Sequence, residues 1–209
     1  MTLALTPLLQ ARALAFLRQD EPVFGPIDFT LNTGEIALVE GDNGSGKTTL
    51  MRVLTGMLRA TQGEVLLEGA PFALDRVAGA IVFLGHQLGL KAELTPRENL
   101  SLAQALYGRR EGLSIEGALR DVGLAGYDAE PVRRLSAGQK KRAALARLLI
   151  LPARVWLLDE PYANLDRDGI ALVNRLIDTH ARRGGAALVT SHGAVSFAGD
   201  ALRRIRLHA

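Results

Sequence analysis

The sequence predicts an α/β fold whose core is a mostly parallel sheet, and three observations support this prediction. Residues 35–40 are apolar enough for a buried strand, and they lead through a glycine-rich loop into a helical pattern at 49–54. Residues 155–160 form a second apolar run, which ends in two carboxylates. Short apolar runs at 81–84 and 186–190 are separated by long segments with helical spacing, as parallel strands require.

The composition is that of a globular domain with a sizeable core. Of the 209 residues, 48% are hydrophobic and 22% are charged, which fits one α/β domain with or without a subdomain. The formal charge is only +3, and basic clusters such as Lys140-Lys141-Arg142 are interpreted as solvated helix faces, so no nucleic-acid partner is expected. The absence of cysteine excludes disulfides and agrees with a reducing cytosol. No signal peptide or transmembrane helix is apparent, so we expect any membrane attachment to depend on a partner.

The glycine-rich loop is the strongest single feature. Residues 41–48 match the P-loop pattern G-x-x-x-x-G-K-T in the strand–loop–helix context that this motif requires. Glycines let successive N–H groups converge on phosphate oxygens at the helix N-terminus. In this motif Lys47 reaches the β- and γ-phosphates, and the Thr48 hydroxyl ligates Mg²⁺. The expected nucleotide site comprises Gly41, Asp42, Asn43, Gly44, Ser45, Gly46, Lys47, Thr48 and Thr49.

The first ninety residues are expected to combine antiparallel strands with this phosphate-binding unit. Residues 8–15 and 26–32 are predicted as strands joined by a polar turn, and residues 63–69 as a strand bounded by glycines. The strand at 81–84 carries Gln87 toward its carboxyl end, where ligands of open α/β sheets bind. Gln87 could contact a metal ion or a water there, although a surface amide is the simpler interpretation of the residue in isolation.

From about 92 to 150 the pattern becomes helical. Thr95 opens a helix with a capping box, and a shorter helix is predicted over 114–122. Ser136 is expected to cap a third helix, and Gly138 allows an anion to approach the N-terminus of that helix. Local sequence alone favours a capped helix without a ligand.

The acids at 159 and 160 follow the apolar run that begins at 155. If that run is a buried parallel strand, both acids lie at its carboxyl end. Asp159 is in position to hold Mg²⁺, directly or through water. Glu160 could polarise an attacking water as a general base. An acidic turn without a ligand is the alternative for these residues taken alone.

The rest of the chain is expected to complete the sheet. Asp166 begins a helix, and the strand at 186–190 carries His192 toward the same edge of the sheet. In residues 202–207 apolar residues alternate with arginines, and this segment is predicted as an edge strand. His180 has no comparable context and is interpreted as a surface residue.

The order of these pieces resembles the ATP-binding-cassette (ABC) family of ATPases over nearly the whole chain. The matching pieces are the Walker A loop (41–48), the Q-loop glutamine (Gln87), the signature sequence (135–139), Walker B with its catalytic glutamate (155–160), the D-loop (165–166) and the switch histidine (His192). The resemblance implies a single P-loop NTPase domain of the ABC type over residues 1–209. Residues 1–90 and 154–209 would form the nucleotide-binding core with its β-subdomain, and residues 91–153 an inserted helical subdomain.

The resemblance also implies ATP and Mg²⁺ as cofactors and two chains paired head to tail. The implied metal ligands are Thr48, Gln87 and Asp159, and the implied catalytic residues are Glu160, His192 and Gln87. Each ATP would lie between one chain's Walker motifs and Ser136, Gly138 and Gln139 of the partner subunit. His192 would contact the γ-phosphate, and Asp166 would link the two sites.

Three positions depart from the family pattern. Ala137 stands in the signature where the family usually has glycine, and Ala163 opens the D-loop in place of serine. Gapless spacing puts Arg18 where an aromatic residue usually stacks on adenine, with Phe16 as the alternative, so that contact is left open.

A closer resemblance is to the ATPase subunits of bacterial cytochrome c maturation systems. It is carried by residues 84–87, 89–91, 93–95 and 98–100 and by the signature 135–139. This resemblance implies a peripheral location on the cytoplasmic face of the bacterial inner membrane and an integral-membrane permease subunit as the partner. The implied role is haem export or release of a haem-loaded chaperone.

Two alternatives to this role remain, and a third does not fit the sequence. One is the ATPase subunit of another small ABC transporter. Another is a soluble ABC-type ATPase acting on DNA or the ribosome, against which stand the single cassette and the lack of a long heptad insertion. A small-molecule P-loop kinase does not explain residues 135–139.

Overall fold

Two sheets form the framework of the fold in the computed structural model, which describes residues 7–73, 77, 79–191 and 202–207. The strands are β1 (Pro7–Arg18), β2 (Glu21–Asn32), β3 (Ile36–Glu40), β4 (Gln62–Leu67), β5 (Ala70–Pro71), β6 (Ile81–Leu84), β7 (Val155–Asp159), β8 (Ala186–Thr190) and β9 (Arg203–Arg206). A four-stranded antiparallel sheet has the order β2-β1-β4-β5. A five-stranded parallel sheet has the order β6-β7-β8-β3-β9.

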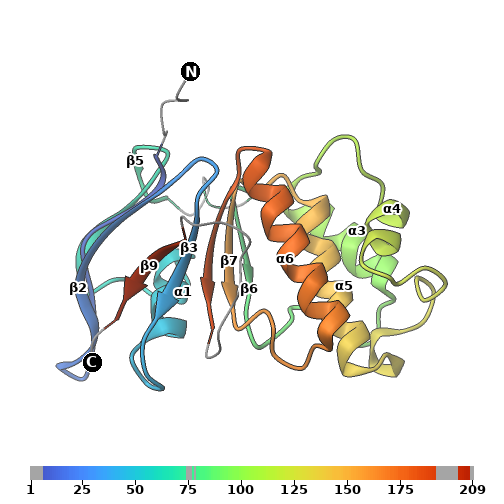
Figure 1. Cartoon of the computed structure of the whole chain (residues 1–209), viewed down its shortest axis with the longest axis horizontal. Coiled ribbons are helices and arrows are strands. Elements are labelled where there is room, and N and C mark those ends of the chain that lie inside the picture. The colour runs from blue at the N-terminus through green and yellow to red at the C-terminus, as the bar shows by residue number, and fades with distance from the viewer. Residues whose placement is uncertain (1–6, 74–76, 78, 192–201, 208–209) are drawn as a thin grey trace.

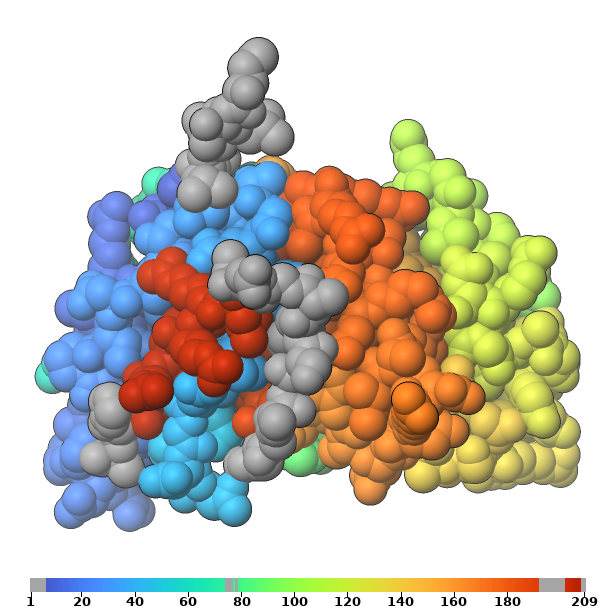
Figure 2. Space-filling view, viewed as in Figure 1, coloured from blue at the N-terminus to red at the C-terminus, as the bar shows by residue number. Residues whose placement is uncertain are grey.

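The helices lie on both faces of the parallel sheet. They are α1 (Lys47–Leu54), α3 (Pro96–Tyr107), α4 (Ile115–Asp121), α5 (Ala137–Ile150) and α6 (Arg167–Arg182), with a 3₁₀ turn, η1 (Val132–Arg134). Figure 1 shows α1 between the two sheets and α5 and α6 on the opposite face of the parallel sheet. In the space-filling view the blue N-terminal strands gather at one end and the yellow-green helical segment at the other, with α6 between them in orange (Figure 2).

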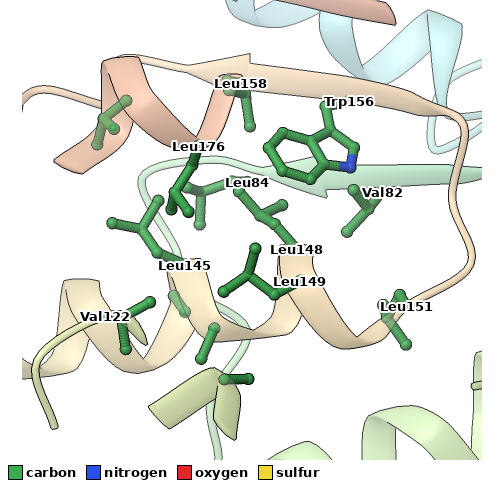
Figure 3. Packing of buried hydrophobic residues seen from close by; sticks show 14 of the residues in the cluster. Val82, Leu84, Val122, Leu145, Leu148, Leu149, Leu151, Trp156, Leu158 and Leu176 are labelled. Atoms are coloured by element: carbon green, nitrogen blue, oxygen red, sulfur yellow. The ribbon is translucent and has the colours of Figure 1, made fainter. Parts of the chain in front are cut away.

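Two hydrophobic cores follow from the alternation of side chains along the central strands. On β7, Val155 and Leu157 belong to the cluster that includes α1 and the antiparallel sheet, whereas Trp156 and Leu158 face the cluster built with α5 and α6. Successive strand residues point to opposite faces, so a continuous apolar run supplies both cores. Figure 3 shows the second core, with Leu148 of α5 beneath Trp156.

The N-terminal hairpin is longer than the sequence predicted. Both of its strands span twelve residues, and only Gln19 and Asp20 form the turn. Both turn residues have left-handed φ values, 52° and 65°, which is the geometry of a tight hairpin turn that matches strand twist. The apolar alternation ends before the strands do, because the tip of the hairpin is exposed and its residues need not be hydrophobic.

The predicted helix starts and the edge strand are confirmed. Thr95 and Ser136 each cap a helix, and Glu98 and Gln139 complete the two capping boxes. Strand β9 pairs with β3 at the edge of the sheet, and Arg204 forms an ion pair with Glu40 there.

His180 was wrongly predicted as a surface residue. It is 3% exposed, and its ring stacks on Trp156 at a centroid distance of 3.9 Å. The physical reason is helical spacing, because position 180 lies on the same face of α6 as the buried Val173, Leu176 and Ile177. His208 lies outside the described residues.

The predicted α/β class is confirmed, with an antiparallel sheet at the N-terminus, a parallel core sheet, and helices between β6 and β7. The division into a core (1–90 and 154–209) and a helical subdomain (91–153) stays a prediction. Within the described ranges, no helix has both the length and the apolar character needed to cross a membrane.

Candidate active site

The loop before α1 leaves the N-terminus of that helix open to an anion. Gly46 is the N-cap residue with φ 87°, and a Cβ there would come within 2.7 Å of the Val23 carbonyl oxygen. The N-cap glycine provides no side chain to cap α1, and the first turn of the helix contains no acidic residue. The unsatisfied N–H groups and the helix dipole therefore favour a negatively charged ligand at this point.

Two buried polar side chains line this loop. Lys47 is 7% exposed, and its Nζ donates to the carbonyl oxygens of Gly41 and Asp42 at 2.6 and 2.9 Å. Ser45 Oγ is buried and has no hydrogen-bond partner among the described residues. Because an orphaned buried hydroxyl is costly, the donor groups here fit a phosphate ligand.

Asp159 joins the loop to the end of the parallel sheet. It is 1% exposed, and its Oδ2 accepts a 2.7 Å hydrogen bond from Thr48 Oγ1. Its Oδ1 accepts a second 2.7 Å bond from Thr190 Oγ1, on the neighbouring strand β8. The structure thus brings Thr48 and Asp159 into contact, and a hydroxyl beside a carboxylate is an oxygen donor set that suits Mg²⁺.

Glu160 follows Asp159 in a left-handed conformation with φ 52°. Its N–H donates to Thr190 Oγ1 at 2.9 Å, and its carbonyl oxygen accepts from Lys141 Nζ at 3.3 Å. The sequence reasoning missed both neighbours. Lys141 was assigned to a solvated face and is in fact 6% exposed, because the buried side of α5 faces the end of β7. Burial lowers its pKa, while the carboxylates of Asp159 and Glu160 act in the opposite direction.

Gln87 lies on the wall of a cavity of about 760 Å³ that Thr48 and Asp159 also line. Arg147 of α5 borders the same cavity and donates to the carbonyl oxygens of Phe83 and Gly89, at 3.0 and 3.2 Å. These bonds join α5 to both ends of the segment that carries Gln87.

The signature residues stand apart from this cavity. Ser136 Oγ accepts from the Gln139 N–H at 3.2 Å, and Gln139 Oε1 accepts from the Ser136 N–H at 2.8 Å. Among the described residues, no atom lies within 4 Å of a Cβ built at Gly138, so this helix N-terminus is open there. Asp166 caps α6 through a 2.7 Å bond from the Gly169 N–H.

His192 lies outside the described residues. Arg18 is exposed near the tip of the hairpin, whereas Phe16 stacks with Phe24 at 6.5 Å, so the adenine-stacking residue stays open.

Comparison with known proteins decides the family. The ABC transporter family model matches residues 24–163, a span that includes the P-loop, the signature and both acids. The chain belongs to the ABC transporter family. Membership makes it an ATP-binding, ATP-hydrolysing subunit of the kind that works with membrane partners.

Relatives and solved structures agree with this membership. The chain is 58% identical over 188 residues to the "Cytochrome c biogenesis ATP-binding export protein CcmA" of Xanthomonas campestris pv. campestris (strain 8004), covering 90% of this chain and 88% of that protein. It is 47% identical over 195 residues to the protein of the same name from Methylococcus capsulatus, with 92% and 94% coverage. A candidate ABC transporter ATP-binding protein from Pyrococcus furiosus superposes with a TM-score of 0.81 at 27% identity, covering 96% of this chain and 97% of that one.

Proposed function

We propose that this chain is the ATP-hydrolysing, energy-coupling subunit of an ABC complex in cytochrome c maturation, where hydrolysis drives haem export or release of a haem-loaded chaperone. The hydrogen bond between Thr48 and Asp159, with Glu160 next in the chain, is the observation that carries the ATPase role. The 58% and 47% identities to proteins named for cytochrome c biogenesis support the pathway.

The proposed mechanism relies on positioning and charge. ATP phosphates lie on the open N-terminus of α1, and the Lys47 ammonium supplies charge beside them. Thr48, Asp159 and Gln87 would hold Mg²⁺, which when bound neutralises phosphate charge. Water attacks the γ-phosphorus in line with the bridging P–O bond to the β-phosphate, and this bond breaks as ADP leaves. Glu160 accepts a proton from the attacking water.

Substitution Glu160→Gln tests the base. The amide cannot take the proton, so ATP binding should persist while multiple-turnover hydrolysis stops, and an ATP-dependent dimer should accumulate. Phosphate release and size-exclusion chromatography with ATP·Mg measure the two effects. Turnover at the parental rate would show that Glu160 is not the base.

The signature is proposed to act on the ATP bound by a second copy of the chain. This proposal would give a ligand to the open, capped N-terminus of α5, which does not line the cavity containing Thr48 and Asp159. The His192 contact with the γ-phosphate and the link through Asp166 belong to the same proposal.

The chain contains a matched control for this role of Ser136. Thr95 caps α3 with the same capping-box geometry, so Ser136→Ala and Thr95→Ala should each cost about 1 kcal/mol of stability. Only Ser136→Ala should also abolish the ATP-dependent dimer of the Glu160→Gln chain. If both substitutions weaken the dimer equally, Ser136 acts as a cap alone.

The permease subunit is proposed to dock at the cavity that Gln87 lines, on the cytoplasmic face of the inner membrane. Three large hydrophobic side chains on its wall are exposed: Met57, Leu106 and Tyr107. Exposed apolar side chains clustered at a hollow are typical of protein contacts. Contact there would place the permease beside the Gln87 segment.

A pull-down from detergent-solubilised membranes tests the pathway, with tagged Glu160→Gln and ATP·Mg present. We expect to recover integral-membrane proteins of the cytochrome c maturation apparatus. Adding Leu106→Glu should reduce this recovery, whereas Tyr127→Glu, an exposed residue away from the cavity, should not. Recovery of another permease would leave the ATPase mechanism and remove the haem pathway, and recovery of ribosomes or nucleic acid would contradict the membrane role.

A further inference from the structure

A buried lysine outside the expected motifs touches the peptide of the proposed base. Lys141 is the fifth residue of α5. Its Nζ lies 3.3 Å from the Glu160 carbonyl oxygen, and its side chain is 6% exposed. Burying an ammonium group is unfavourable unless opposite charges compensate. The compensating charges are the carboxylates of Asp159 and Glu160, which both attract Lys141.

The peptide that Lys141 holds is in an unfavourable conformation. Glu160 has φ 52°, and a left-handed backbone is unfavourable for a non-glycine residue. Such a conformation persists only where surrounding groups enforce it. Here Thr190 accepts the Glu160 N–H at 2.9 Å, and Lys141 donates to the carbonyl oxygen. Both polar groups of the residue are thus fixed by side chains from other elements, β8 and α5.

We propose that Lys141 is a positioning residue that holds the Glu160 backbone so that its carboxylate faces the attacking water. The inference rests on the proposed role of Glu160 as the base. Changing φ at Glu160 would swing the Cα–Cβ bond and move the carboxylate, and displacements of about 1 Å can cost a hundredfold in rate.

The position of Lys141 on α5 adds a connection between sites. Ser136 at the N-terminus of the helix and Lys141 are separated by about 7.5 Å of helix axis. In the proposed dimer, Ser136 contacts the ATP of the other subunit while Lys141 holds the base of its own site. Helix α5 therefore connects the proposed contact with the other subunit's ATP to the backbone of Glu160.

A purely structural role for Lys141 makes different predictions. If the lysine only balances buried carboxylates, its loss should weaken folding and nucleotide binding, and the effect should not depend on Glu160. If Lys141 positions the base, its loss should lower kcat and leave ATP affinity intact. The effect should also disappear once Glu160 is replaced.

The experiment combines Lys141→Met and Lys141→Arg with the parental chain and with Glu160→Gln. Phosphate release gives kcat and KM, and titration with a fluorescent ATP analogue gives affinity. We expect Lys141→Met to lower kcat about ten- to a hundredfold, with KM and affinity changed less than about twofold. Lys141→Arg, which keeps the charge and the donors, should stay within about threefold of the parental kcat.

In the Glu160→Gln chain, Lys141→Met should leave the residual single-turnover rate unchanged. The inference would be overturned if Lys141→Met lowered the rate equally in the parental and Glu160→Gln chains. It would also be overturned if Lys141→Met weakened ATP affinity or left kcat at the parental value. Should Lys141→Met fail to fold, Lys141→Gln replaces it with the same expected results. Parental turnover by Glu160→Gln alone would instead contradict the proposed function, so the two failures are distinguishable.

Discussion

Acidification should destabilise this protein through His180. The ring is 3% exposed, stacks on Trp156, and lies 3.1 Å from the Arg154 carbonyl oxygen through Nε2. Burial, reinforced by the positive charge of Arg110, lowers the pKa of His180 from 6.5 to about 4. The ring is therefore neutral in the folded protein at neutral pH, with its proton on Nε2.

The sign and size of the effect follow from proton linkage. Between pH 6.5 and about 4 the unfolded chain binds a proton at His180 that the folded chain excludes. Stability is therefore full above pH 6.5 and falls as the pH drops through this window. With about 1.4 kcal/mol for each tenfold change in proton affinity, the total loss is about 3 kcal/mol. About 2 kcal/mol of it should be lost by pH 5.

The assay is urea unfolding at pH 7.5 and pH 5, with His180→Phe as the matched variant. Phenylalanine keeps an aromatic ring against Trp156, and the Arg154 carbonyl retains a 2.8 Å hydrogen bond from the Ala186 N–H. The parental chain should lose about 2 kcal/mol more than the variant between the two pH values. The same loss in both proteins would refute the assignment to His180.

Two further predictions concern the phosphate-binding loop. Lys47→Ala should abolish ATP binding, because it removes the buried cation from the loop. Titration with a fluorescent ATP analogue measures this binding. The control variant Lys140→Ala, on the accessible side of α5, should bind the analogue normally. Gly46→Ala should cost about 1–3 kcal/mol in urea unfolding, because the left-handed φ and the nearby Val23 carbonyl both oppose a Cβ. An unchanged midpoint would show that the loop adapts.

Features that depend on a few neighbouring residues could be predicted from the sequence. The capping boxes at Thr95 and Ser136 formed as expected, because both partners of each bond lie within one helical turn. The spacing of His180 from Val173 and Leu176 also indicated that its side chain is buried. His180 was mispredicted because its polarity was taken to indicate exposure, although helical spacing placed it on an apolar face.

Contacts between distant segments could not be predicted in the same way. Thr190 was expected only as the end of a strand, yet it bonds both Asp159 and the Glu160 N–H. That contact requires β8 to lie beside β7, in a register that pairs Thr190 with Asp159. Strand order depends on how crossover segments pack, and nothing in the local pattern encodes it.

The sequence by itself determined the elements of this protein: the glycine loop and its helix, the apolar strand that ends in two carboxylates, and the capped signature helix. Each depends on backbone preferences and periodicity within a short window. The tertiary structure alone decided which side chains complete the site. The order β7-β8-β3 places Thr190 next to Asp159, and the packing of α5 against the sheet turns Lys141 toward Glu160. Burial and charge pairing of that kind arise only when segments far apart in the chain meet.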